Sequence, residues 1–208
     1  MYYQELLDRL IEENFLKTPL IIEAFKKNNR ADFLPAELKD EAGNNVPLPI
    51  GFGQTNSQPL TVAFMLELLE PRPGEKILDI GAGSGWTSAL LAYCVGEQGR
   101  IYAIERIPEL YEFGKNNVAK YNYIVKRIVK WYCEDGINGL LGQAPFDKIL
   151  ASASASEIPA AWKEQLKIGG KMVVPIKNSI WLITKKSDKE FNQEEFFGFS
   201  FVPLISEL

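Results

Sequence analysis

The chain has 208 residues, of which 46% are hydrophobic and 24% are charged, and its formal net charge at pH 7 is −4. This size and composition are typical of one soluble globular domain. The acidic balance gives no basic footprint for nucleic acid or an anionic membrane, and the lack of histidine excludes histidine acid–base catalysis and the commonest metal ligand. We therefore expect no nucleic-acid partner, no membrane partner and no metal.

The two cysteines, Cys94 and Cys133, lie far apart in the sequence and form no CxxC motif. Such cysteines are typical of a reducing intracellular compartment. No stretch has the apolar character of a signal peptide or the length of a membrane-spanning helix. We expect a cytoplasmic protein and, since nothing in the sequence demands an oligomer, a monomer.

The N-terminal part of the chain predicts helices and a long loop. Residues 2–15 place apolar side chains at helical spacing, and Thr18 before Pro19 predicts the N-cap of a second helix over residues 20–29. The segment RADFLP ends that helix. A long loop without apolar periodicity then precedes the next helix, residues 61–70.

Strand-like and helix-like segments alternate through the rest of the chain, which predicts βαβ units and a parallel sheet. The expected strands are residues 76–80, 100–105, 126–133, 146–152 and 171–176. The expected helices are residues 87–96, 108–121, 137–141 and 158–166, the last of which stops at Gly169 and Gly170. Two final strand-like runs, 179–186 and 195–204, have no helix between them and predict an antiparallel pair at the end of the sheet.

These patterns predict a single domain over residues 1–208. Residues 1–60 form its N-terminal helical segment and loop, and residues 61–208 form an α/β core with a seven-stranded, mostly parallel sheet. No linker-like stretch separates the two parts.

A glycine-rich turn, ILDIGAGSGW, follows the first strand of the core and opens a helix. Gly81, Gly83 and Gly85 allow a tight turn and the close approach of a ligand to backbone N–H groups. Glu105 ends the next strand, twenty residues after Gly85, where a carboxylate can accept hydrogen bonds from both hydroxyls of a ribose. A nicotinamide cofactor would require GxGxxG, whereas Trp86 occupies the position of its third glycine.

The turn and its preceding aspartate, D-x-G-x-G-x-G, resemble the first motif of class I S-adenosylmethionine-dependent methyltransferases. The resemblance implies a Rossmann-like fold, with S-adenosyl-L-methionine as cofactor and S-adenosyl-L-homocysteine as product. The segment CEDG follows the third strand, where this family commonly contacts the adenine amino group. The cofactor-binding residues implied by the resemblance are Asp79, Gly81, Gly83, Ser84, Gly85, Glu105, Arg106, Asp135 and Gly136.

The stretch PLPIGFGQTNSQP, residues 47–59, resembles the PLPIGxGQTISQP signature of protein-L-isoaspartate O-methyltransferases. RADFLP, AIERIPELYE, FDKILASASASEIP, GGKMVVPI and FVPL resemble further segments of that family in the same order. The chain also departs from the family. Asn56 replaces Ile or Val, Phe52 replaces a frequent histidine, and SASAS has serines where alanines are usual.

This resemblance implies methyl transfer to the free α-carboxylate of L-isoaspartyl residues in damaged proteins and peptides. The ester then closes to a succinimide, which reopens partly to normal aspartate. Ser57 is implied as the catalytic residue beside the substrate carboxylate. The peptide channel implied by the family is lined by Gln54, Thr55, Asn56, Ser57, Ser152, Ala153 and Ser154.

The implied chemistry needs no general base, because a carboxylate with a reference pKa near 4 is already ionised at neutral pH. Since the chain has no histidine, turnover is expected to change little between about pH 6 and pH 8.

Other interpretations stay open. Ser57 precedes a helix and is also typical of an N-cap, and Asp79 is also typical of a strand-end residue that binds turn amides. The glycine turn and the SASAS serines could serve packing alone. The alternative functions are methylation of another substrate and a cofactor-binding protein that has lost turnover.

Overall fold

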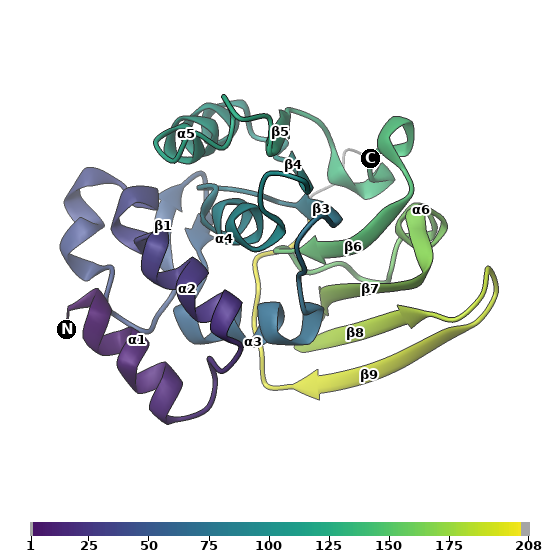
Figure 1. The fold of residues 1–208 in the computed structure, drawn as a ribbon, viewed down its shortest axis with the longest axis horizontal. Helices are drawn as coiled ribbons and strands as arrows, with labels where there is room; N and C mark the ends of the chain where they lie inside the picture. Colours follow the sequence, from purple (N-terminus) through teal and green to yellow (C-terminus); the bar gives the residue numbers. More distant parts are fainter. Residues whose placement is uncertain (1, 205–208) are drawn as a thin grey trace.

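Seven strands form one mixed sheet in the computed structural model, which describes residues 2–204 (Figure 1). Their order is β5-β4-β3-β6-β7-β8-β9. Neighbours from β5 to β7 pair in parallel, whereas β8 pairs antiparallel with β7 and with β9. The bounds are β3 Lys76–Ile80, β4 Arg100–Ile104, β5 Val129–Tyr132, β6 Phe146–Ala151, β7 Leu166–Ile176, β8 Ser179–Lys185 and β9 Phe191–Phe197. The predicted seven-stranded, mostly parallel sheet with an antiparallel C-terminal pair is confirmed.

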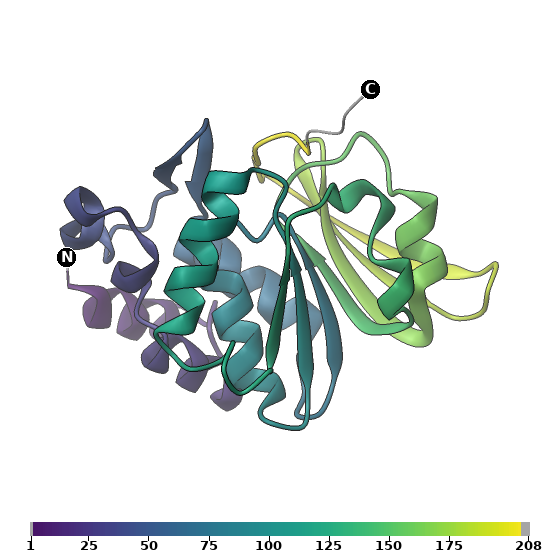
Figure 2. The same ribbon diagram turned by 90° about the horizontal axis from the view of Figure 1, so that it is seen from above.

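Helices cover both faces of the parallel strands, which explains why those strands are apolar on both faces (Figure 2). In β3, Ile77 belongs to the core on one face, whereas Leu78 and Ile80 belong to the core on the other. Three helices cover the first face, and α6 covers the second with its buried Trp162. The bounds are α3 Pro59–Leu69, α4 Trp86–Val95, α5 Pro108–Ala119 and α6 Ala160–Gln165.

The N-terminal helices α1 (Tyr3–Glu12) and α2 (Pro19–Lys27) extend the core of the first sheet face. Phe25 of α2 packs edge-to-face on Trp86 of α4, with ring centroids 5.5 Å apart. This continuous core supports the prediction of a single domain. The ends of that predicted domain, residue 1 and residues 205–208, lie outside the described residues.

Thr18 begins α2 as predicted, but its side chain does not cap the helix. The Thr18 hydroxyl instead donates a 2.6 Å hydrogen bond to the carboxylate of Glu67 in α3, which also accepts from the backbone amides of Lys17 and Thr18. The helix start is therefore fixed by a carboxylate fifty residues away in sequence, a contact that local pattern cannot predict.

A β-hairpin occupies part of the segment that the sequence predicted as an aperiodic loop. β1 (Leu48–Gly51) pairs antiparallel with β2 (Gln54–Asn56). Phe52 and Gly53 form the two-residue connection with φ angles of 54° and 70°, as a type I′ turn requires. Both strands are too short for their alternation to be recognised in the sequence, and Pro49 interrupts β1.

Several element ends differ from the predictions. The helix expected at 137–141 is replaced by two 3₁₀ turns, Gly136–Asn138 and Leu141–Gln143. β7 starts directly after α6 and includes Gly170, where a Cβ would lie 2.7 Å from the carbonyl oxygen of Asp147. The glycine pair therefore lies inside a strand and is not a helix stop.

The C-terminal run 195–204 is not one strand. β9 ends at Phe197, and Gly198, with a φ of 97°, turns the chain away from the sheet. The segment after it returns to the carboxyl end of β6, where the Ser154 amide donates to the Val202 carbonyl (2.8 Å) and the Leu204 amide donates to the Ser154 carbonyl (2.7 Å) (Figure 1).

Candidate active site

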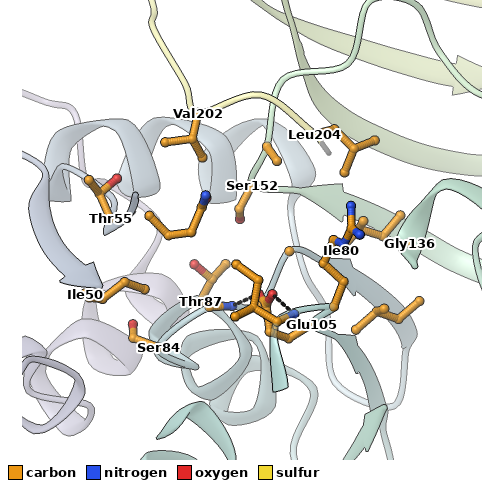
Figure 3. A pocket seen from close by; sticks show the side chains of 18 of the residues that line it. Ile50, Thr55, Ile80, Ser84, Thr87, Glu105, Gly136, Ser152, Val202 and Leu204 are labelled. Atoms are coloured by element: carbon orange, nitrogen blue, oxygen red, sulfur yellow. Dashed lines mark hydrogen bonds between the residues drawn. The ribbon is translucent and has the colours of Figure 1, made fainter. Parts of the chain in front are cut away.

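A pocket lies at the carboxyl ends of β3, β4 and β6, where the strand order reverses on the two sides of β3. This is where open α/β sheets bind their ligands. The pocket and its mouth together span about 780 Å³, part of which is open to solvent. Figure 3 shows Ile50 and Thr55 of the hairpin, Glu105 of β4's end and Val202 of the C-terminal segment around this space.

The glycine turn forms the floor of the pocket. Gly81 and Gly83 line it with φ angles of 75° and 51°, a conformation that favours glycine. The amides of Gly81 and Ala82 both donate to the Ile104 carbonyl at 3.0 Å, which holds the turn against the end of β4. Ser84 is buried and also lines the pocket.

Glu105 links the turn to the end of β4. Its side chain is buried, and its two oxygens accept hydrogen bonds from the backbone amides of Gly83 (2.8 Å) and Ile107 (2.9 Å) (Figure 3). Each oxygen keeps a second lone pair. The carboxylate is therefore fixed in position and still able to accept hydrogen bonds from a ligand.

Asp79 lies beneath the turn and does not line the pocket. It is fully buried, and its Oδ2 accepts a 2.5 Å hydrogen bond from the Ser88 hydroxyl of α4. Within residues 2–204 its Oδ1 has no hydrogen-bond partner. Burial raises the pKa of Asp79 to about 7. The interpretation that Asp79 binds turn amides is wrong, since the partner found is a helix hydroxyl.

Gly85 is also outside the pocket lining. A Cβ there would lie 2.7 Å from Cγ2 of Val118 and 2.8 Å from the carbonyl oxygen of Gly114. This glycine permits the close packing of α4 on α5, so the packing interpretation applies to Gly85 and not to the two glycines before it.

The remaining predicted cofactor residues lie on the β4 and β5 side of the pocket. Arg106, Asp135 and Gly136 all line it, together with Glu134. Asp135 accepts a hydrogen bond from the Ile137 amide (2.9 Å), which orients its carboxylate at the start of a 3₁₀ turn. The pocket wall thus carries three carboxylates, including Glu105, and one guanidinium.

The hairpin and the residues after it form the opposite wall, where Gln54, Thr55, Asn56 and Ser57 line the pocket. The N-cap interpretation of Ser57 is wrong: Gln58 is the N-cap of α3, and α3 has no side-chain cap. The hydrogen bond found at Ser57 uses its carbonyl, which accepts from Arg30.

Arg30 was missed by the sequence analysis as a residue that shapes the site. It is fully buried, and its guanidinium donates to the carbonyls of Asn44 and Val46 at 2.8 Å and to that of Ser57 at 3.1 Å. Burial lowers the pKa of Arg30 to about 10, so the group stays charged at neutral pH. The RADFLP match marked the segment but gave no sign of these contacts.

The third wall follows β6, where Ser152 and Ala153 line the pocket. Ser154 does not; its backbone holds the C-terminal segment through Val202 and Leu204. Val202, Pro203 and Leu204 themselves line the pocket, and the sequence analysis missed them because it assigned them to a strand.

Within the described residues, no group of three or more His, Cys, Asp or Glu side chains could hold a metal ion. Over the same part of the chain, no helix has the length and apolar character needed to cross a membrane. The cysteines are free, with Cys94 buried and Cys133 exposed.

Comparison with known proteins gives a consistent result. The sequence profile of the protein-L-isoaspartate(D-aspartate) O-methyltransferase family matches residues 1–208. A protein-L-isoaspartate O-methyltransferase of Methanopyrus kandleri is 44% identical over 98% of this chain and 91% of its own length, and one of Aeropyrum pernix is 41% identical over 99% and 81%.

Solved structures share the fold. A protein-L-isoaspartate O-methyltransferase from Plasmodium falciparum, in complex with S-adenosyl-L-homocysteine, superposes with a TM-score of 0.89 at 22% identity and covers 99% of both chains. Another structure of that activity has a TM-score of 0.88 at 26% identity and covers 99% of this chain and 66% of its own. The predicted class I methyltransferase fold is confirmed, and the chain belongs to the protein-L-isoaspartate(D-aspartate) O-methyltransferase family.

Proposed function

We propose that this chain is a protein repair methyltransferase that moves a methyl group from S-adenosyl-L-methionine to the free α-carboxylate of L-isoaspartyl residues in damaged proteins and peptides. The observation that carries the proposal is its membership of the family over the whole chain. The pocket supports it, because a glycine turn with a buried carboxylate and a wall with a serine face the same space.

The glycine-turn side of the pocket fits the cofactor. Gly81 and Gly83 expose backbone without a Cβ, and a Cβ at Gly83 would already lie 3.3 Å from Ile50. We assign Glu105 to the ribose hydroxyls, because both of its oxygens are fixed and keep an accepting lone pair. We assign Asp135 to the adenine amino group.

The other predicted cofactor residues have less direct roles in this proposal. Ser84, Arg106 and Gly136 complete the wall around the cofactor. Asp79 and Gly85 act from outside the pocket, by shaping the turn and the packing of α4.

The substrate carboxylate is assigned to the hairpin side. The Ser57 hydroxyl donates a hydrogen bond to it, while Gln54, Thr55, Ser152 and Ala153 border the peptide. Ser57 orients the carboxylate without holding it firmly, because a strongly bound anion is a poorer nucleophile. The bound cofactor supplies an electrophilic methyl group on a sulfonium.

No residue needs to remove a proton, because the carboxylate is already ionised at neutral pH. The chain's contribution is to align the reacting groups and to exclude water with Ile50, Val202 and Leu204. Alignment of this kind can contribute up to roughly 7–11 kcal/mol.

We further propose that the protein acts as a monomer in the cytoplasm, on damaged proteins and peptides and not on nucleic acid or membranes. Two free cysteines that are separate from the pocket, and the acidic net charge of −4, support this part of the proposal.

The test is transfer of a labelled methyl group to an isoaspartyl peptide and to its aspartyl twin. We expect the isoaspartyl peptide to be labelled at least about a hundredfold faster. Released methanol must be counted together with the ester, because the ester decays faster as pH rises. Comparable labelling of both peptides would indicate a broader carboxyl methyltransferase. Binding of S-adenosyl-L-homocysteine with no transfer to either peptide would indicate a binding protein without turnover.

A further inference from the structure

Asn56 lies between the hairpin and the glycine turn and uses both ends of its amide there. It is only 3% exposed. Its Oδ1 accepts a 2.8 Å hydrogen bond from Nε of Arg30, and its Nδ2 donates a 3.0 Å hydrogen bond to Oγ of Ser84. The amide therefore joins the guanidinium beneath the hairpin to a hydroxyl of the turn that lines the pocket.

The Arg30 end of this link makes further contacts with the same segment. The same guanidinium donates to the backbone carbonyls of Asn56 and Ser57, at 3.2 and 3.1 Å, and lies over the ring of Trp86 at the start of α4, 5.6 Å from its centroid. Since a guanidinium presents its donors in a fixed fork, these contacts set the position of β2 and of Ser57 together.

The Ser84 end of the link is fixed from the cofactor side. The carbonyl of Ser84 accepts a 3.0 Å hydrogen bond from the Asn117 side chain of α5, and its neighbour Gly83 donates to Glu105. A ligand that binds this turn restricts Ser84 further. A second ligand that needs the hairpin ordered then loses less conformational entropy on binding.

We propose that Asn56 is a positioning residue that couples the cofactor-binding turn to the hairpin, so that binding at the turn orders the segment containing Ser57. We assign Asn56 this role in place of peptide contact because its side chain is buried and each end of its amide has a buried partner. The inference rests on the proposed function for the identity of the ligand at the turn.

The test is hydrogen exchange of the backbone amides of residues 54–57, with and without saturating S-adenosyl-L-homocysteine. In the unmodified chain the ligand should slow this exchange by about tenfold, within the range of couplings between linked sites. Asn56→Leu keeps a side chain of similar size but removes both hydrogen bonds. In this variant the ligand should slow exchange by less than about twofold. Asn56→Asp should keep the effect. Its carboxylate still accepts a hydrogen bond from Arg30, and it can accept a second one from the Ser84 hydroxyl, which acts as the donor in this variant.

Asn56→Leu also leaves Arg30 with an unpaired buried donor and could unfold the chain. Ser84→Ala removes the link and leaves the contact of Arg30 with Asn56, so it should lose the effect in a folded protein. Asn45→Leu is the matched control. It removes a 3.0 Å hydrogen bond to the Leu60 amide of α3 without contacting the turn, and it should keep the full effect.

The proposal is overturned if the unmodified chain binds the ligand without slower exchange at 54–57. The proposal is also overturned if the ligand still slows exchange at residues 54–57 fully in Ser84→Ala. It is likewise overturned if the ligand no longer slows this exchange in Asn56→Asp. Failure of the unmodified chain to bind S-adenosyl-L-homocysteine at all contradicts the proposed function and this inference together. Binding without hairpin protection contradicts the inference alone.

Discussion

Gly83 lines the pocket and its backbone contacts Glu105. Its amide donates to Glu105, and its φ of 51° strains any other residue. We expect Gly83→Val to weaken binding of S-adenosyl-L-homocysteine by about a hundredfold or more, measured by calorimetry. Gly74→Val is the control, since Gly74 also has a positive φ but has open space around it and lies outside the pocket. Undiminished binding by Gly83→Val would contradict the assignment of the turn.

Ser57 tests the substrate side of the pocket. Because Gln58 and not Ser57 is the N-cap of α3, Ser57→Ala should leave the free energy of unfolding nearly unchanged. We expect it to lower kcat by about ten- to a hundredfold, the scale of a hydrogen bond to a charged group, with little change in cofactor affinity. Ser156→Ala, at an exposed position outside the pocket, should change neither quantity. Loss of stability without loss of turnover would exclude the proposed role.

Asp79 predicts a pH dependence of stability. Burial raises its pKa from 3.8 to about 7, so the folded chain favours the protonated carboxyl. This contribution to stability is complete below about pH 4 and is lost as pH rises through about pH 7. Asp79→Asn removes the titration. Its stability relative to the unmodified chain should therefore rise by about 4 kcal/mol from pH 4 to pH 8, measured by denaturant unfolding at each pH. A difference that does not vary with pH would contradict this account.

The missing histidines led us to expect turnover that changes little near neutral pH. That expectation concerned the reacting groups and stays a prediction. The structure adds Asp79, a carboxyl beneath the turn whose pKa burial raises to about 7. No sequence pattern indicates this, because its burial depends on tertiary packing that includes the contact with Ser88 of α4.

Residues that line the pocket could be predicted where a sequence motif fixes the local backbone geometry. The glycine spacing placed Gly81 and Gly83 in the pocket, and the distance along the chain placed Glu105 there. The contact of Arg30 with Asn56 could not be predicted, since the two residues are 26 positions apart and meet only through the folded hairpin.

At the scale of elements, the hairpin turn contains an unfavourable residue. Phe52 has a φ of 54° and is 58% exposed, so its side chain gains little from burial. Phe52→Asn creates Asn-Gly, the preferred type I′ pair, and should stabilise the fold by about 1 kcal/mol in thermal unfolding. Phe197→Asn, at an exposed position in β9, should give no gain. If Phe52→Asn lowers stability, the Phe52 ring stabilises the fold, and the claim that its side chain gains little from burial is wrong.

The C-terminal segment shows why apolar runs are ambiguous. Phe199 stacks on Phe64 of α3 with ring centroids 5.1 Å apart, and Val202 and Leu204 line the pocket. These apolar residues are thus explained by partial burial outside a sheet, although the run has the composition of a strand. Most of the alternating elements between residues 76 and 176 were predictable because β3, β4 and β6 are each followed by a helix that packs on the sheet.

At the scale of the whole molecule, strand alternation predicted a parallel sheet but could not give the order of its strands. That order puts β6 beside β3, which brings Ser152 to the glycine turn, where the Ser152 amide donates to the Ile80 carbonyl at 2.9 Å. The pocket is therefore assembled by topology from segments at both ends of the chain, with the hairpin on one side and residues 202–204 on another.

The central claim is that this pocket presents the free α-carboxylate of an isoaspartyl residue to the methyl donor. The most direct measurement is kcat/KM for three peptides of one sequence: the isoaspartyl form, the same form with its α-carboxylate converted to an amide, and the aspartyl form. We predict transfer to the first and at least about a hundredfold less to the other two. Comparable transfer to the amide form, or to the aspartyl form, would contradict the claim.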